Sequence, residues 1–148
     1  MIFCRLVIVL SVVAASLATG PLARAECFLL TAKYVMEQSI SELVFSGTVV
    51  EVTRTAELGY RATFEVDRIW KGAVSKRFDL YVWELAPETP RFEVGRHYVA
   101  LAIRLTDSVS RQRAGVIGTE TVAYSPVFCS NSLSPDIVRE LGIGEPPK

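Results

Sequence analysis

The chain has 148 residues, and its 16 basic residues equal its 16 acidic residues, so the formal net charge is zero. This length fits one domain with one hydrophobic core. A nucleic-acid-binding protein normally carries an excess of basic residues, so the balanced charge argues against a nucleic-acid partner.

The first 25 residues have the pattern of a secretory signal peptide. A basic start over residues 1–5 precedes an uncharged apolar run over residues 6–18, and Ala23 and Ala25 are the small residues that a signal peptidase recognises. A permanent membrane anchor is the competing interpretation, but the run is shorter than the roughly 18–20 residues that span a bilayer. We therefore expect residues 26–148 to form one secreted domain, periplasmic in a Gram-negative cell, with no stable membrane anchor after cleavage.

Cleavage changes both the charge and the cysteine count. Two arginines leave with the signal, which reduces the 16 basic residues to 14 against 16 acidic ones, and Cys4 leaves as well. Cys27 and Cys129 remain, and in an oxidising compartment they predict a disulfide. A closed loop of about 100 residues stabilises a fold by up to roughly 4.7 kcal/mol. Two free thiols, one of them a metal ligand, are the alternative, but no His or Cys lies nearby to complete a site, and no metal is expected.

The first half of the domain predicts a helix and a hairpin. Residues 31–41 fit a short helix capped by its first residue, a threonine. Residues 43–54 are rich in β-branched side chains and predict a long strand, in which Gly47 indicates a bulge or tight bend. A turn over residues 57–59 then leads into a strand over residues 60–70, so the two strands should form an antiparallel hairpin.

The second of these strands shows the clearest alternation in the chain. Phe64 and Val66 should point into the core, whereas Glu65 and Asp67 should face water. The phase breaks at Ile69, which indicates a bulge near the strand end. We expect the tryptophan that follows it to cap one end of a barrel.

The second half predicts three more strands and a second helix. The strands are residues 77–84, 97–105 and 115–127. The intervening segments, 85–92 and 106–114, are proline-rich or polar and predict loops, the second of them mobile. Ser134 suits an N-cap and Gly142 a helix end, and the tail over residues 145–148 should fray. Five mostly antiparallel strands with interior glycines favour a small barrel over a flat sandwich.

Four segments follow one another along the domain: ELVFSGTVVEV, ATFEVDRIWKG, FEVGRHYVALA and FCSNSLSPDIVRELG. Together they resemble the landmarks of bacterial proteins similar to the tissue inhibitors of metalloproteinases, within the wider netrin-like group. The resemblance extends from Cys27 to Gly142. It implies a mainly β fold, a five-stranded antiparallel OB-like barrel with short flanking helices, and a non-enzymatic module whose partner is a protein such as a metalloprotease.

The resemblance also implies a contact ridge at the mature N-terminus, over Glu26, Cys27, Phe28 and Leu29. In the animal inhibitors, the chain begins with a Cys-x-Cys motif whose free amine and carbonyl chelate the zinc of the protease. This chain has Leu29 in place of the second cysteine, and cleavage after Ala25 leaves Glu26 ahead of Cys27. The amine of Cys27 would then be an amide, which is not a zinc-binding amine.

No group of residues in the sequence predicts catalysis or a cofactor. His97 is the only histidine, and a surface or rim position fits it better than a catalytic base, which needs a nucleophile and an orienting partner nearby. Acidic residues at alternate strand positions usually indicate a solvated face. The acidic residues considered are Glu65, Asp67, Asp79, Glu84 and Glu88.

The aromatic residues leave a second function open. Tyr60, Tyr81, Trp83 and Tyr124 could form a stacking platform of the kind on which OB barrels bind sugars. The same side chains could instead cover the core or a protein-binding patch. A barrel that binds a carbohydrate or another small ligand is therefore the alternative to a protein-binding module.

Overall fold

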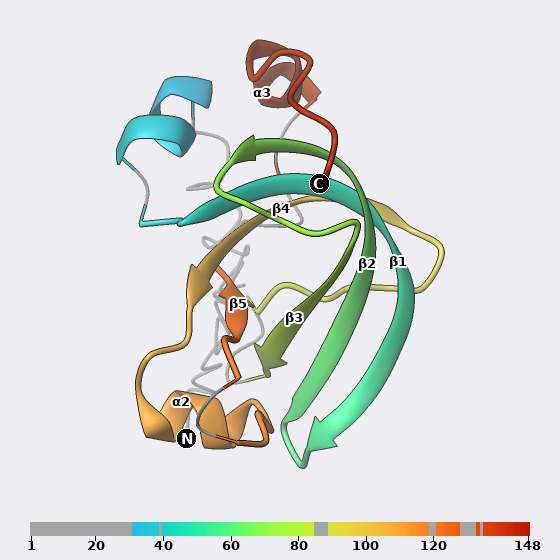
Figure 1. Ribbon diagram of the computed structural model, residues 1–148, viewed down its shortest axis with the longest axis vertical. Coiled ribbons are helices and arrows are strands. Elements are labelled where there is room, and N and C mark those ends of the chain that lie inside the picture. The colour runs from blue at the N-terminus through green and yellow to red at the C-terminus, as the bar shows by residue number, and fades with distance from the viewer. Residues whose placement is uncertain (1–30, 39, 85–88, 119–120, 128–132, 134) are drawn as a thin grey trace, which may run out of the picture.

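The computed structural model describes residues 31–38, 40–84, 89–118, 121–127, 133 and 135–148. These residues form a mainly β structure with three short helical elements (Figure 1). In chain order, the elements are η1 (Tyr34–Gln38, a π-helix), β1 (Leu43–Ala56), β2 (Gly59–Lys71), β3 (Arg77–Trp83), β4 (His97–Arg104), α2 (Ser108–Arg113), β5 (Tyr124–Pro126) and α3 (Pro135–Glu140). No helix in this described part is long and apolar enough to cross a bilayer.

The five strands form a closed barrel in the order β1-β2-β3-β5-β4, which confirms the predicted OB-like barrel. Four of the five strand pairs are antiparallel, but β3 pairs with β5 in parallel, at Leu80 and Tyr124. The expectation of a mostly antiparallel barrel is therefore confirmed, with this one parallel pair. An odd number of strands cannot alternate in direction all the way around a closed ring, so one parallel pair is required.

The predicted hairpin is confirmed as β1 and β2, and several bulges bend it within the barrel. The sequence predicts the bulge at Gly47, and its cause is close packing between the two strands. A Cβ atom on Gly47 would lie 2.5 Å from the carbonyl oxygen of Glu65 and 3.0 Å from the Cα of Val66. Only glycine lets the two backbones approach this closely.

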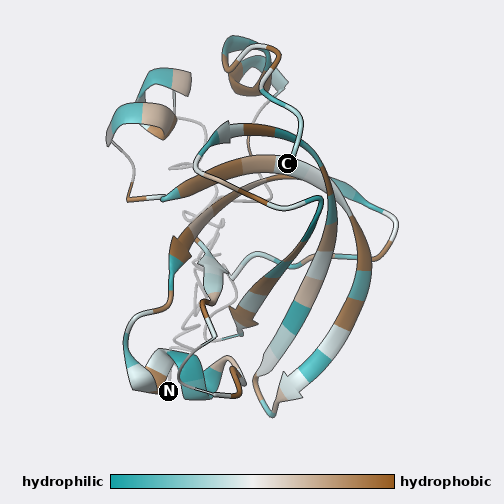
Figure 2. Ribbon diagram, viewed as in Figure 1, coloured by the Kyte–Doolittle hydropathy of each residue, from teal (hydrophilic) through white to brown (hydrophobic). Residues whose placement is uncertain are grey.

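The interior of the barrel is filled by aromatic and aliphatic side chains. Phe64 is fully buried and meets Phe45 and Phe92 edge to face, with ring centroids 5.5 and 5.1 Å apart. Val66 is also buried, as predicted, and apolar and polar residues alternate along β2 (Figure 2). Three partly buried aromatic side chains complete this core: Phe78, Tyr98 and Tyr124.

A second apolar cluster lies outside the interior, where η1 and α3 pack against β1 and β4. Its buried members include Val35, Val44 and Ile137, and Trp70 packs against them. The bulge next to Ile69 is confirmed, because the register skips Trp70. Ile69 belongs to the interior and Trp70 to the outer cluster, where its Nε1 donates to the carbonyl oxygen of Gly142 at 3.0 Å. Trp70 therefore does not plug the interior of the barrel, because it packs in the outer cluster.

The segment predicted as a mobile loop, residues 106–114, instead contains α2. Asp107 caps this helix by accepting a hydrogen bond from the Ser110 N–H at 2.7 Å. Among the described residues of the strand predicted over 115–127, only the three residues of β5 are in a strand. The side chain of Arg111 explains much of this difference, because it donates to the carbonyl oxygens of Leu105, Gly118 and Thr121 and so holds a compact loop.

The two ends of the described domain are also anchored. Thr31 caps the first helical turn, as predicted, by accepting the Tyr34 N–H at its hydroxyl oxygen. Gly142 follows α3 with a φ of 79°, as expected of a helix end, whereas Ser134 lies outside the described residues. The tail does not fray at Glu145, because its backbone exchanges two hydrogen bonds with Ile69, of 2.8 and 2.7 Å.

Candidate functional site

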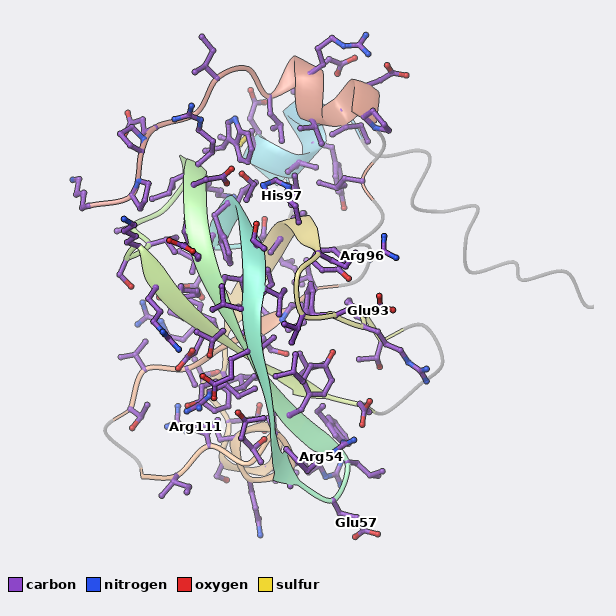
Figure 3. All side chains as sticks on the ribbon, turned by 90° about the vertical axis from the view of Figure 1, so that its right-hand side faces the viewer. Arg54, Glu57, Glu93, Arg96, His97 and Arg111 are labelled. Carbon is purple, nitrogen blue, oxygen red and sulfur yellow. The ribbon has the colours of Figure 1, made fainter. Side chains whose placement is uncertain are left out.

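The only histidine of the chain belongs to a polar cluster that joins three strands. Ser46 of β1 donates its hydroxyl hydrogen to Asp67 Oδ1 of β2 at 2.5 Å, and Nε2 of His97 of β4 lies 3.1 Å from Asp67 Oδ2. The Gly47 bulge creates this arrangement, because it leaves Asp67 unmatched in the register between β1 and β2. We call Ser46, Asp67 and His97 the Asp67 cluster; His97 lies near one end of the barrel in Figure 3.

The order of these three residues is wrong for nucleophilic catalysis. A serine nucleophile needs a histidine next to its hydroxyl and an acid behind the histidine. Here the acid lies between the other two residues, and Ser46 is only 2% exposed. The predicted surface position of His97 is confirmed, since 52% of its side chain is exposed. The cluster therefore tethers β1, β2 and β4 to one another.

The charge of Asp67 is stabilised by this cluster. Partial burial raises the pKa of Asp67, but the hydrogen bonds from Ser46 and His97 and the charge of His97 outweigh it, so that the pKa lies below its usual value. Because the pKa is lower in the folded protein, the carboxylate stabilises the fold above the unfolded value of about 3.9. That stabilisation is lost as the pH falls through the folded value.

We expect Asp67→Asn to lower the unfolding free energy by about 1 kcal/mol at pH 7. A hydrogen bond to a charged group usually contributes more than this, but solvent exposure of Asp67 reduces its contribution. The difference from the wild type should shrink as the pH falls through the folded pKa of Asp67, where the wild-type carboxylate becomes neutral as well. Urea unfolding across this acidic range measures it. Glu65→Gln on the same strand is the control and should change little; an equal loss at every pH for Asp67→Asn would contradict this role.

The outer face of β1, β2 and β3 carries a network of opposite charges. Glu51 accepts a hydrogen bond from Arg77 at 3.1 Å and lies 3.5 Å from Arg61, whose Nε is 3.9 Å from Asp79. The hydroxyl of Thr53 and these two arginines hold the pKa of Glu51 below its usual value. The two carboxylates are thus engaged with arginines, and they do not form an acid–base pair.

The predicted aromatic platform does not form as one surface. Tyr60 is buried, and its hydroxyl group donates to the Pro90 carbonyl and accepts the Phe92 N–H. Tyr124 packs against the interior ring of Phe78, and the guanidinium of Arg113 lies 4.5 Å above the ring of Trp83. Tyr81 remains on the outer face, in register with Arg61. Of these four aromatic residues, only Tyr60 is buried, and Tyr81, Trp83 and Tyr124 are partly exposed.

A depression of about 540 Å³ lies beside α2, at the end of the barrel opposite to His97 (Figure 3). Thr55, Thr106, Ser108 and Arg111 are among its lining residues. The guanidinium of Arg111 is already bonded to three backbone carbonyls, so its main role is to hold the loop that forms the depression.

Several predicted site residues fall outside the described part of the chain. These are the ridge residues Glu26, Cys27, Phe28 and Leu29, the second predicted disulfide residue, Cys129, and the acidic residue Glu88. Within the described residues, no group of three or more metal-ligating side chains gathers. No family model, curated protein or solved structure matches this chain.

The structure also reveals a surface that the sequence prediction missed. Val50 and Val52 of β1 and Val94 of the segment before β4 are all substantially exposed. The bulge at Val50 explains the first of them, because it interrupts the alternation of β1. The signal in the sequence was the pair of adjacent valines, Val49 and Val50, in an otherwise alternating strand.

Proposed function

We propose that residues 26–148 form an exported, non-enzymatic module that binds another protein through its outer surface. The observation that carries this proposal is the filled interior of the barrel, where aromatic rings pack edge to face around Phe64. A barrel of this size has little room for a ligand once side chains occupy it. A partner would then be recognised by the outer face of the strands and by the loops.

The exposed groups favour a protein partner over a sugar. Val50, Val52 and Val94 offer aliphatic surface, and the ion pairs Arg54–Glu84 and Arg96–Glu93 lie next to these residues along the chain. Apolar surface rimmed by polar groups is typical of protein-binding sites. The carbohydrate alternative rested on four aromatic residues, of which Tyr60 lies in the core.

The proposal of export rests on residues 1–25 and on the two cysteines that remain after their removal. The intact mass of the secreted protein should correspond to a chain that begins at Glu26, with Cys27 and Cys129 joined in a disulfide. Mass spectrometry before and after reduction measures both properties. Retention of residues 1–25, or two free thiols under oxidising conditions, would contradict the proposed export.

Two binding assays test the nature of the partner. A glycan array should show no binding, and a positive result would replace the protein-binding proposal with the carbohydrate alternative. A panel of metalloproteases tests the inhibitory role that the resemblance implies. Inhibition by a chain that begins at Cys27 would assign the N-terminal amine as the zinc ligand, whereas a start at Glu26 without inhibition would direct attention to the barrel surface.

A further inference from the structure

The longest strand of the barrel has one edge that is only partly paired. β1 pairs with β4 from Leu43 to Thr48, and Val49 still bonds to the loop that precedes β4, at Gly95 and Arg96. Beyond Val49, β1 pairs with β2 alone within the described part of the chain. In a strand, backbone N–H and C=O groups point alternately to the two sides, so half of those from Val50 onward have no strand partner.

This free edge is short and bounded at both ends. At one end Gly95 donates to the carbonyl oxygen of Val49, and at the other end the Thr55 hydroxyl donates to the Ala114 carbonyl. The segment between them, Val50–Arg54, is what we call the free edge. Its two valines are 39% and 40% exposed, although aliphatic residues are normally buried. In Figure 3, β1 faces the viewer, with Arg54 near its lower end.

Three ion pairs lie at or beside the free edge. Arg54 lies 2.5 Å from Glu84, and Glu51 lies 3.1 Å from Arg77. Beside the edge, Arg96 lies 3.4 Å from Glu93 (Figure 3). Val94 lies between Glu93 and Arg96 in the chain, and because it is 61% exposed it adds aliphatic surface. Because these described charges are paired with one another, the exposed valines are the feature that an occupant would match, and the matching segment is aliphatic.

The size of the free edge indicates what kind of occupant it takes. Five residues of strand extend over about 17 Å. A stable interface between folded proteins buries about 800 Å² on each partner and involves some 20–30 residues a side. The edge alone is therefore too small for a stable dimer of this chain, and its length matches the extended peptides that other domains bind by strand addition.

We propose that an extended, aliphatic segment of a partner protein adds to the barrel as a further strand along Val50–Arg54. Main-chain hydrogen bonds provide the pairing, and alternate β-branched side chains of the segment pack on Val50, Val52 and Val94. This inference rests on the proposed protein-binding function and specifies its site.

The test uses the mature chain labelled with ¹⁵N and a synthetic peptide, acetyl-KTVTVTVK-amide. The peptide should shift the amide signals of Val50–Arg54 and slow hydrogen exchange at alternate residues there by roughly tenfold or more, because those amides become paired. Two versions of the peptide, N-methylated on either set of alternate residues, distinguish backbone pairing from apolar adhesion. One of them should lose binding.

Matched variants test the location. Val52→Lys should weaken peptide binding by roughly tenfold, since an inserted lysine is how natural edge strands resist strand addition. Ile117→Lys replaces another exposed aliphatic residue, 90% exposed, and should leave binding unchanged. An unchanged melting temperature for both variants excludes loss of the fold.

Three results would overturn the edge site: shifts that map elsewhere, equal binding of both N-methylated peptides, or a free chain that sediments as a dimer with Val50–Arg54 already protected. The last result would assign the edge to a second copy of the chain. These outcomes are separate from failure of the proposed function, since a glycan ligand refutes protein binding whatever the edge does. If the exported chain binds neither glycans nor the peptide, only the proposed edge site is refuted, and the proposed protein-binding function is not.

Discussion

Replacement of Phe64 by alanine is expected to lower the unfolding free energy by about 3–5 kcal/mol, the usual cost for a buried phenylalanine. The side chain is fully buried, and its ring meets Phe45 and Phe92 edge to face. These neighbours belong to β1 and to the segment before β4, so a cavity at Phe64 would loosen contacts across the barrel. Small domains are stable by only 5–15 kcal/mol or so, and the loss is a large part of that.

Urea unfolding of the mature chain measures this effect. Phe64→Leu keeps most of the volume and should lose less, on the order of 1.5 kcal/mol. Val122→Ala, at a position that is 62% exposed, is the surface control and should change the unfolding free energy by no more than about 0.5 kcal/mol. If Phe64→Ala costs no more than Val122→Ala, Phe64 does not hold the interior together.

The position of Phe64 was predictable because the alternation in β2 is a local signal. Phe64 and Val66 point inward and Glu65 points outward, as the period of a strand requires. The hairpin followed from two such strands joined by a short turn. Both features depend on residues that are close to one another in the sequence, so a short segment is enough to predict them.

Other features depend on contacts between distant residues, and the sequence prediction missed them. Arg111 shortens the last predicted strand by bonding to three carbonyls of its own loop. Glu145 is ordered by Ile69, a residue in the middle of the chain. The parallel pairing of β3 with β5 follows from closure of the ring, which no single segment specifies. Local propensity is overridden in each of these places.

The candidate surfaces divide in the same way. The surface position of His97 was predictable, but its contact with Asp67 required knowledge of which strands are neighbours. The free edge required the register, because it exists only where β1 continues past β4. The aromatic platform was predicted from residue type alone, and Tyr60 shows why that fails, since a tyrosine can be buried when its hydroxyl finds partners.

Replacement of Gly47 by alanine should cost about 2–3 kcal/mol, because the new methyl group would meet backbone atoms that cannot move away as a flexible side chain can. Its Cβ would lie 2.5 Å from the Glu65 carbonyl oxygen. The two strands must separate or shift to accept it, and Asp67 lies in the bulge that they share. We therefore expect the Asp67 cluster to be disrupted along with the stability.

Two measurements separate this effect from an ordinary glycine substitution. Gly95→Ala is the matched control, since Gly95 has a φ of 82° but a Cβ added there would meet no atom within 4 Å beyond its chain neighbours, and it should cost about 1 kcal/mol from backbone strain alone. In Gly47→Ala, the pKa of Asp67 should also rise toward its ordinary value, as seen by NMR titration, because its hydrogen bonds from Ser46 and His97 are lost. A destabilised variant with the Asp67 pKa unchanged would show that the bulge and the cluster are independent.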